Sequence, residues 1–422
     1  MGAGHSHRAD RSATDAAVKV RGVPRQLLLG SLVLAAAATV VGLFALWPQS
    51  DRVDDLRTGF TFAGEGTTFP RAVVDGIEPA CPPGDDGGAG QPGQPGQPGQ
   101  DGGCGRMRVT VLEGQSEGTT AQVPVPPHVA DSGLQEGDTV RLMRVPDGNL
   151  SYFGTERPRP LWVLTVLFVL VVGLVARFRG IMALVGLGFA GWIIATFLLP
   201  GLLTGESALL LGLVACSAIM FVVIYTTHGF SVRTSVALAG TLLGIGITAL
   251  VGAVSIAATR LTGIGDEGAS VLVTFAPDLD FQGLLTCAVM IAGLGVLNDV
   301  TITQASAIWE LRAASGTMTR SRLLTSGMRI GRDHIASTIY TIAFAYTGTA
   351  LTTLLVLSLY DLPLLQVLST EEIAQEVVRT LVTSIGLVLA VPLTTVLGVV
   401  LVPGATSGPA DEPDREAVGD LV

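Results

Sequence analysis

Asp299 is the residue of this sequence whose type and position point most directly to chemistry. It follows Asn298 at the end of a Gly-rich apolar run, IAGLGVLND, and the next residues, VTITQASAI, can continue the same helix. A carboxylate within a bilayer is costly and usually functional, and removal from water favours its protonated form. The pattern therefore indicates a candidate proton or cation site at Asp299 and Asn298.

Two interpretations of Asp299 depend on where the surrounding span ends. If the span runs to about Ala305, the carboxylate lies within the membrane; if it ends at Leu297, Asp299 is a solvated residue at a helix end. A buried carboxylate needs a partner or a proton, because an isolated charge there is too costly. The following loop and span contain three candidate partners: Arg332, Tyr340 and Thr341.

Motifs of common soluble enzymes do not occur in the sequence. It has no P-loop, no Rossmann glycine pattern after a strand, no HExxH and no GxSxG. We therefore expect no catalytic residues, no metal site and no cofactor, and a protein that is not an enzyme; an intramembrane enzyme is the third alternative after those given below. The net charge of −10 does not indicate a nucleic-acid partner.

The candidate site sits among long uncharged stretches, in a chain that is 49% hydrophobic and 14% charged. A helix of about 20 apolar residues crosses a bilayer of roughly 30 Å, and a helix satisfies its own backbone in lipid. We predict a membrane α-helical fold with eight transmembrane helices and a small exported β-rich domain between helices 1 and 2. The predicted spans are at about 27–47, 161–176, 180–200, 207–227, 234–257, 282–303, 336–359 and 380–402.

The first span, 27–47, is an uncleaved anchor in this interpretation, because it is longer than the apolar region of a signal peptide; a cleaved signal is the alternative. The fifth span carries small residues at intervals of four, which place them on one helix face and predict close helix approach. These residues are Gly240, Gly244, Thr248 and Gly252.

Basic residues predict the orientation, since Arg and Lys concentrate in cytoplasmic loops. With the N-terminus inside, fourteen Arg and Lys residues fall in cytoplasmic segments, five of them in the 304–335 loop, whereas the short outside loops carry only Arg260 and Arg379. We therefore predict a multi-pass protein of a bacterial cell membrane with both termini cytoplasmic. The polar tail 1–26 and the acidic tail 403–422 are predicted to be disordered.

Residues 48–160 form the predicted exported domain. RVTVL, QVPVP and DTVRLMRV combine β-forming residues with flanking turn residues, which predicts a small β-barrel or sandwich. A Gly-Gln-Pro repeat interrupts the domain as a flexible insert. Cys81 and Cys104 flank the repeat and are a disulfide candidate if the loop is exported; the alternative is two unpaired thiols.

Several segments in a fixed order resemble the YibE/F-like family of multipass membrane proteins. They are ARFRGIMALVGL, FLLPGLLTG, GLGVLNDVTITQASAIWEL, SGMRIGRDHIAST, AYTG and EEIAQEVVRTLVTSIGLVLAVPLTT. The resemblance runs from the exported domain to Val402, and it implies a topology more firmly than a function. The sequence departs from the family at Tyr340–Ile342, where an Asn-Thr-Leu type of segment is expected.

The segment around Asp299 is also similar to the proton-using helix pair of SecD/SecF and RND-type exporters. The similarity lies in GLGVLNDVTITQASAIWELRAASG, an Arg-bearing loop and a Thr-rich span, and it makes Asp299 the counterpart of their membrane carboxylate. Two extra spans before the Asp-bearing helix depart from that arrangement. The likeness is an analogy of fold and does not by itself assign a function.

These observations favour a transporter or exporter component, proton-coupled through Asp299, whose substrate the sequence does not identify. The alternative is a non-transport scaffold or sensor, in which the exported β-domain binds an envelope partner and the helices anchor it. The expected partners are the lipid bilayer and either a second copy or an envelope protein. A hydrated cavity reaching Asp299 would favour transport, and a dry bundle with Asp299 at the surface would favour the scaffold.

Overall fold

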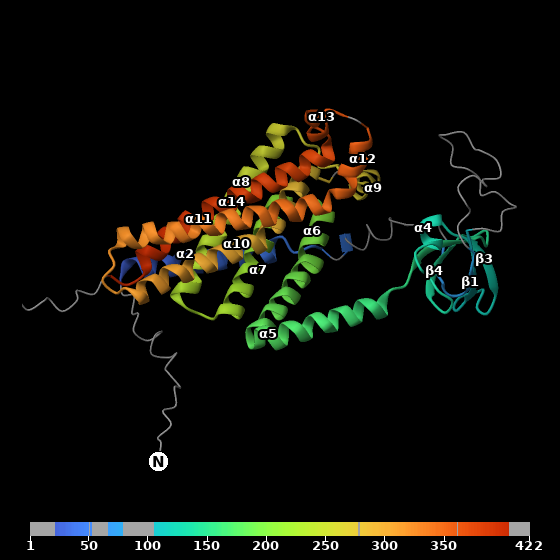
Figure 1. Cartoon of the computed structure of the whole chain (residues 1–422), viewed down its shortest axis with the longest axis horizontal. Coiled ribbons are helices and arrows are strands. Elements are labelled where there is room, and N and C mark those ends of the chain that lie inside the picture. The colour runs from blue at the N-terminus through green and yellow to red at the C-terminus, as the bar shows by residue number, and fades with distance from the viewer. Residues whose placement is uncertain are drawn as a thin grey trace, which may run out of the picture. The chain divides into compact units, whose positions relative to one another are not determined.

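The chain forms two compact units in a computed structural model, which describes residues 22–49, 51–52, 66–78, 105–276, 279–360 and 362–404. One unit is Asp55–Val171, and the other combines Met1–Asp54 with Val172–Val422. Figure 1 shows a β-rich unit and a helical unit. The mostly helical fold with a small β region agrees with the predicted fold class.

The β unit is a curved antiparallel sheet with strand order β3-β2-β1-β4-β5. Alternate residues of β2, among them Met107 and Val109, are buried and pack with residues of the other strands in one apolar core, as a half-buried strand requires. The edge strands β3 and β5 contact each other, so the sheet curls into a half-barrel. The elements are β1 (Arg71–Ile77), β2 (Arg106–Val111), β3 (Thr120–Pro124), α4 (Pro127–Ala130), β4 (Thr139–Arg144) and β5 (Leu150–Thr155).

Three of these strands, β2, β3 and β4, correspond to the predicted segments RVTVL, QVPVP and DTVRLMRV. Cys81, Cys104 and the Gly-Gln-Pro insert lie outside the described residues, as do most of both tails. The disulfide and the disorder of the tails therefore stay predictions.

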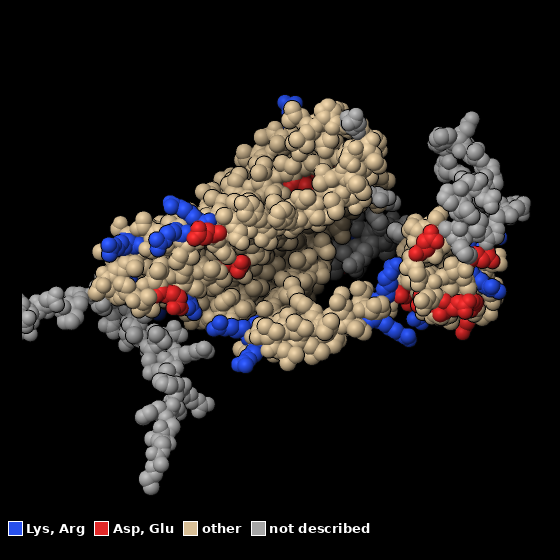
Figure 2. Space-filling view, viewed as in Figure 1, with Lys and Arg blue, Asp and Glu red and all other residues tan. Residues whose placement is uncertain are grey.

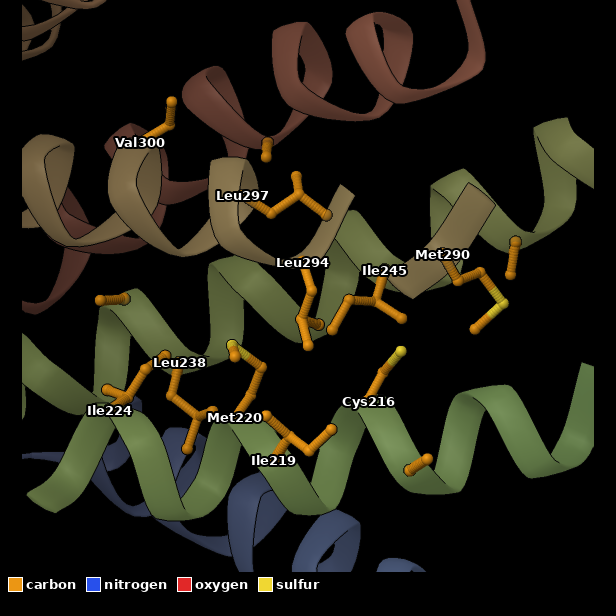
Figure 3. Close-up of a cluster of buried hydrophobic side chains, with 14 of the residues drawn as sticks. Cys216, Ile219, Met220, Ile224, Leu238, Ile245, Met290, Leu294, Leu297 and Val300 are labelled. Atoms are coloured by element: carbon orange, nitrogen blue, oxygen red, sulfur yellow. The ribbon is translucent and has the colours of Figure 1, made fainter. Parts of the chain in front are cut away.

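The helical unit is built around α8, α10 and α14, which pack against one another; α7 packs on α8 and α10, and α11 packs on α10 and α14. Figure 3 shows the apolar side chains of α7, α8 and α10 that meet in its core, such as Ile219, Ile245 and Leu294. Its long helices are α2 (Val23–Ala45), α7 (Ala208–His228), α8 (Val232–Thr259), α10 (Phe281–Ala314), α11 (Arg320–Thr349) and α14 (Glu371–Leu401). Its shorter elements are η1 (Ile194–Leu198), α6 (Leu199–Leu203), α9 (Glu267–Phe275), α12 (Leu351–Leu359) and α13 (Leu364–Leu368).

Six helices of the described chain are long and apolar enough to cross a membrane, or seven if α11 and α12, which bend by 61° at their junction, form one span. The stretch Pro158–Leu203, which begins with α5 (Pro158–Ile193), counts as one of the six although it has 46 residues. A helix of that length is roughly 69 Å long, more than twice the apolar core of a bilayer. It is broken at Arg177, which has φ 53° and ψ −136°. A multi-pass membrane protein is thus supported, whereas the number of eight spans stays a prediction.

The segment 304–335, predicted as a cytoplasmic loop, is mostly helical, and its side of the membrane stays a prediction. α10 continues to Ala314 and α11 begins at Arg320, so the two helices are joined by residues 315–319 alone. The Thr319 hydroxyl caps α11 by accepting a hydrogen bond from the Arg322 backbone N–H at 3.3 Å. Hydropathy marks where a helix leaves the apolar layer of the membrane, and α10 continues as a helix beyond that point.

The start of α14 differs from the predicted start of the last span for the same reason. α14 begins at Glu371, whereas the predicted span began at 380, so Glu371, Glu372 and Arg379 lie on the helix. Likewise α10 does not end at Leu297, so Asp299 is a mid-helix residue. Figure 2 shows that the visible face of the helical unit is largely free of charged side chains, which gather toward the end where α10 meets α11.

Candidate functional site

Asp299 of α10 faces His334 of α11. The Asp299 Oδ2 atom lies 3.7 Å from His334 Nε2, which is ion-pair distance when the imidazole is protonated. The Asp299 side chain is 68% exposed and that of His334 is 31% exposed, so the pair lies at the edge of the α10–α11 contact. Asn298 is partly buried, and its Oδ1 atom, like His334 Nε2, is buried without a hydrogen-bond partner.

The predicted partners of Asp299 lie elsewhere on α11. Among the described residues, the structure records no hydrogen bond or ion pair from Asp299 to Arg332, Tyr340 or Thr341. Arg332 and Tyr340 are exposed, and the Thr341 hydroxyl donates to the Ser337 carbonyl at 3.2 Å. These three residues therefore stay predictions, and the structure adds His334.

The relation between Arg332 and His334 explains why the sequence pointed to Arg332 and not to His334. Two residues along a helix are separated by about 200°, so Arg332 and His334 face nearly opposite directions. The segment GRDHIAST contains both, but only the antiparallel register of α10 and α11 brings His334 to Asp299. That register is a tertiary property with no signal in a single sequence.

A buried polar layer ties α10, α11 and α14 together one turn beyond Asp299. The Gln304 amide donates from Nε2 to the Gly327 carbonyl at 2.9 Å and to Thr395 Oγ1 at 2.7 Å. Gly331 allows this approach, because a Cβ there would lie 2.6 Å from Val391 Cγ1. Every donor in this layer has a partner, so it acts as a packed joint between the three helices.

The small-residue face of α8 makes close contacts with α10 and α14, as predicted. A Cβ at Gly244 would lie 2.8 Å from Leu297 Cδ2 and 3.3 Å from Ala390 Cβ. Nearby, the hydroxyls of Thr241 and Thr301 form a hydrogen bond of 2.6 Å between α8 and α10. The stripe is therefore a packing surface in the core of the unit.

A second group of charged residues lies near the start of α14, away from the Gln304 layer. Arg379 Nη1 contacts Glu376 Oε1 at 3.1 Å, and the Arg379 guanidinium carbon lies 5.9 Å from the centre of the Tyr346 ring. Both charged side chains are only about a quarter exposed. Sequence reasoning missed this group because it assigned Arg379 to a loop.

The β unit contains an open pocket of about 390 Å³. Its lining includes Arg144, whose guanidinium has no recorded partner among the described residues, together with the ring of Phe69. A concave surface with a few polar groups is the usual form of a small binding site. Further lining residues are Pro70, Glu113, Gln115 and Pro146.

Comparison with known families gives one match: a family model described as YibE/F-like protein matches residues 164–404. The matched part contains Asp299, His334 and the Glu376–Arg379 pair, and it begins after β5. It covers more than half of the 422 residues. Curated proteins and solved structures give no match.

Proposed function

Because this chain belongs to the YibE/F-like protein family and has several helices able to cross a bilayer, we propose that it is a proton-coupled component of a membrane transporter or exporter. The observation that carries the proposal is the Asp299–His334 pair, which joins the mainly apolar helix α10 to α11 about midway along both helices. Intramembrane ionisable residues are rare and mark proton and ion pathways. On this proposal the protein is not an enzyme, and it works in the bilayer alone, as a homo-oligomer or with an envelope protein.

The Asp299–His334 pair links proton binding to the packing of α10 against α11. An ionised Asp299 attracts a protonated His334 across 3.7 Å, and a proton added to the carboxylate ends that attraction. α10 and α11 are joined through residues 315–319, and the Gln304 layer holds them near that connection, so the change in packing is expected at Asp299 and beyond it. The proton state of Asp299 thereby biases how α10 and α11 pack.

Asp299→Asn tests the proposal, because it keeps the shape of the side chain and removes its titration. We expect the variant to be expressed and inserted normally and to fail to complement a strain that lacks the gene. His334→Gln should fail in the same way. Glu310→Gln is the control, since Glu310 is an exposed carboxylate of the same helix and should complement. Full complementation by Asp299→Asn would contradict proton coupling through this residue.

A scaffold or sensor is the second candidate function, and two observations favour it: the pocket in the β unit and the 68% exposure of the Asp299 side chain. In that case the pocket binds an envelope ligand or protein, and the helices anchor it. Arg144→Ala distinguishes the two candidates. Loss of complementation by Arg144→Ala together with normal complementation by Asp299→Asn would favour the scaffold.

A further inference from the structure

Glu376, Arg379 and Thr383 lie on one face of α14, because their spacing of three and four residues matches the helical repeat. Tyr346 of α11 lies beside the same group, with its ring centre 5.9 Å from the Arg379 guanidinium carbon. Thr248 of α8 lies beside Thr383, because the methyl groups of the two threonines would lie 4.0 Å and 3.4 Å from a Cβ at Gly293 of α10. The two threonines therefore meet one to two helical turns along α14 from Arg379 and Glu376.

Four atoms of this cluster are buried and have no hydrogen-bond partner among the described residues. They are Glu376 Oε2, Arg379 Nε, Thr248 Oγ1 and Thr383 Oγ1. Unpaired buried polar atoms are few in native proteins and are normally served by an ordered water or an ion. Two of these atoms belong to the Glu376–Arg379 pair and two to the adjacent threonines, so their shared lack of partners needs a physical explanation.

The two threonines differ from most buried threonines of the bundle. Thr241, Thr301, Thr394 and Thr395 are also buried, and each donates its hydroxyl to the carbonyl four residues earlier, at 2.7 to 3.0 Å. Thr248 and Thr383 are only 1% exposed, yet neither hydroxyl makes that bond. The Thr248 hydroxyl packs against Gly386 of α14, so the Thr383 hydroxyl is the one available to a group that enters the cluster.

The chemistry of the cluster selects what can enter. The Arg379 guanidinium repels a metal cation and the Glu376 carboxylate repels an anion, whereas unpartnered donors and acceptors side by side suit water. A proton that reaches that water as hydronium can pass to Glu376 Oε2 and return, which leaves the water neutral, and the carboxylate is neutral while it holds the proton. Gly293 precedes Asp299 by six residues on α10, a rise of roughly 9 Å along the helix axis.

We propose that Glu376, Arg379, Thr383 and Tyr346 form a hydrated proton site, a second station besides Asp299 and nearer to the end of the bundle where α14 begins. This inference extends the proposed function to a further residue set. It makes Glu376 the proton-binding group and makes Arg379 and the hydroxyls the groups that position the water.

Thiol labelling tests whether the site is hydrated, because a cysteine reacts as the thiolate, which does not form readily in apolar surroundings. Thr383→Cys is compared with Val382→Cys and Thr395→Cys in the full chain without native cysteines, using a small water-soluble methanethiosulfonate on membranes open on both sides. Val382 is equally buried at the same depth in an apolar cluster, and Thr395 is a buried threonine whose hydroxyl is bonded. We expect Thr383→Cys to react at least about tenfold faster than both controls. Equal rates overturn the inference.

Complementation tests the proton role. Glu376→Gln should lose function while Glu310→Gln keeps it, and wild-type complementation by Glu376→Gln overturns the proton role. The tests distinguish failure of the second proton site from failure of the proposed function. Slow labelling of Thr383→Cys removes the second site even if Asp299→Asn is inactive, whereas full activity of Asp299→Asn removes the proposed function even if Thr383→Cys reacts fast.

Discussion

Replacing Gly244 by valine should destabilise the helical unit, whereas the same change at Gly246 should not. Both glycines lie in α8, two residues apart. At Gly244 a Cβ would lie 2.8 Å from Leu297 Cδ2 and 3.3 Å from Ala390 Cβ, and at Gly246 no heavy atom lies within 4 Å. The close contacts therefore exist at one position only.

The magnitude follows from comparing the two variants. Gly→Val changes the intrinsic helix propensity by the same amount at both positions, so that contribution cancels in the difference. What remains is overpacking, which costs about 1–3 kcal/mol. Leu297 can change its rotamer, but the Ala390 Cβ is fixed to the α14 backbone, so α8 and α14 must separate. We expect Gly244→Val to be less stable than Gly246→Val by that amount.

Unfolding of the purified protein in mixed detergent micelles, followed by tryptophan fluorescence, measures the difference between the variants. Wild-type protein and Gly246→Val should unfold within about 0.5 kcal/mol of each other, as for other exposed positions. If Gly244→Val unfolds together with them, the close packing of α8 against α10 and α14 is refuted.

Two further predictions concern the polar joint and the topology. Gln304→Leu removes hydrogen bonds to Gly327 and Thr395 and should destabilise the unit by about 2 kcal/mol in the same assay. Gln366→Leu is the control, since Gln366 is exposed and its replacement should have little effect. Equal stability of both variants would argue against the joint. In a background without native cysteines, an impermeant thiol reagent applied to intact cells should label Ser116→Cys and not Ser315→Cys. The reverse pattern would overturn the predicted orientation.

Sequence periodicity predicted the kinds of elements well and their ends poorly. The long apolar runs identified the spanning helices because length and lack of charge are local properties. In the β unit, β2 to β4 were recognised from clustered β-formers, but β1 and β5 were not. β1 contains Asp75 and Gly76, and β5 contains Gly154, residues that are depleted in strands. Pairing with neighbouring strands forms β1 and β5 despite these residues.

The candidate site was predicted in part, because Asp299 and Asn298 interrupt an apolar run and are visible locally. The partner of Asp299 cannot be recognised from the local sequence. His334 lies 35 residues away, and only the antiparallel contact of α10 and α11 selects it over Arg332. A similar limit applies to Gln304, whose two acceptors belong to α11 and α14.

The hydropathy rule that finds membrane spans also misses some charged residues of the spanning helices. It starts a span after the last charged residue, so charges that lie within a helix are assigned to the adjoining loop. Arg379 was counted among loop charges for this reason, yet α14 begins eight residues earlier, at Glu371, and carries both Arg379 and Glu376 into the contact with Tyr346. A paired charge can occupy the margin of a bundle because each partner lowers the cost of burying the other. In this protein the margins of the predicted spans therefore contain paired charges within helices, and the Glu376–Arg379 pair is the clearest example.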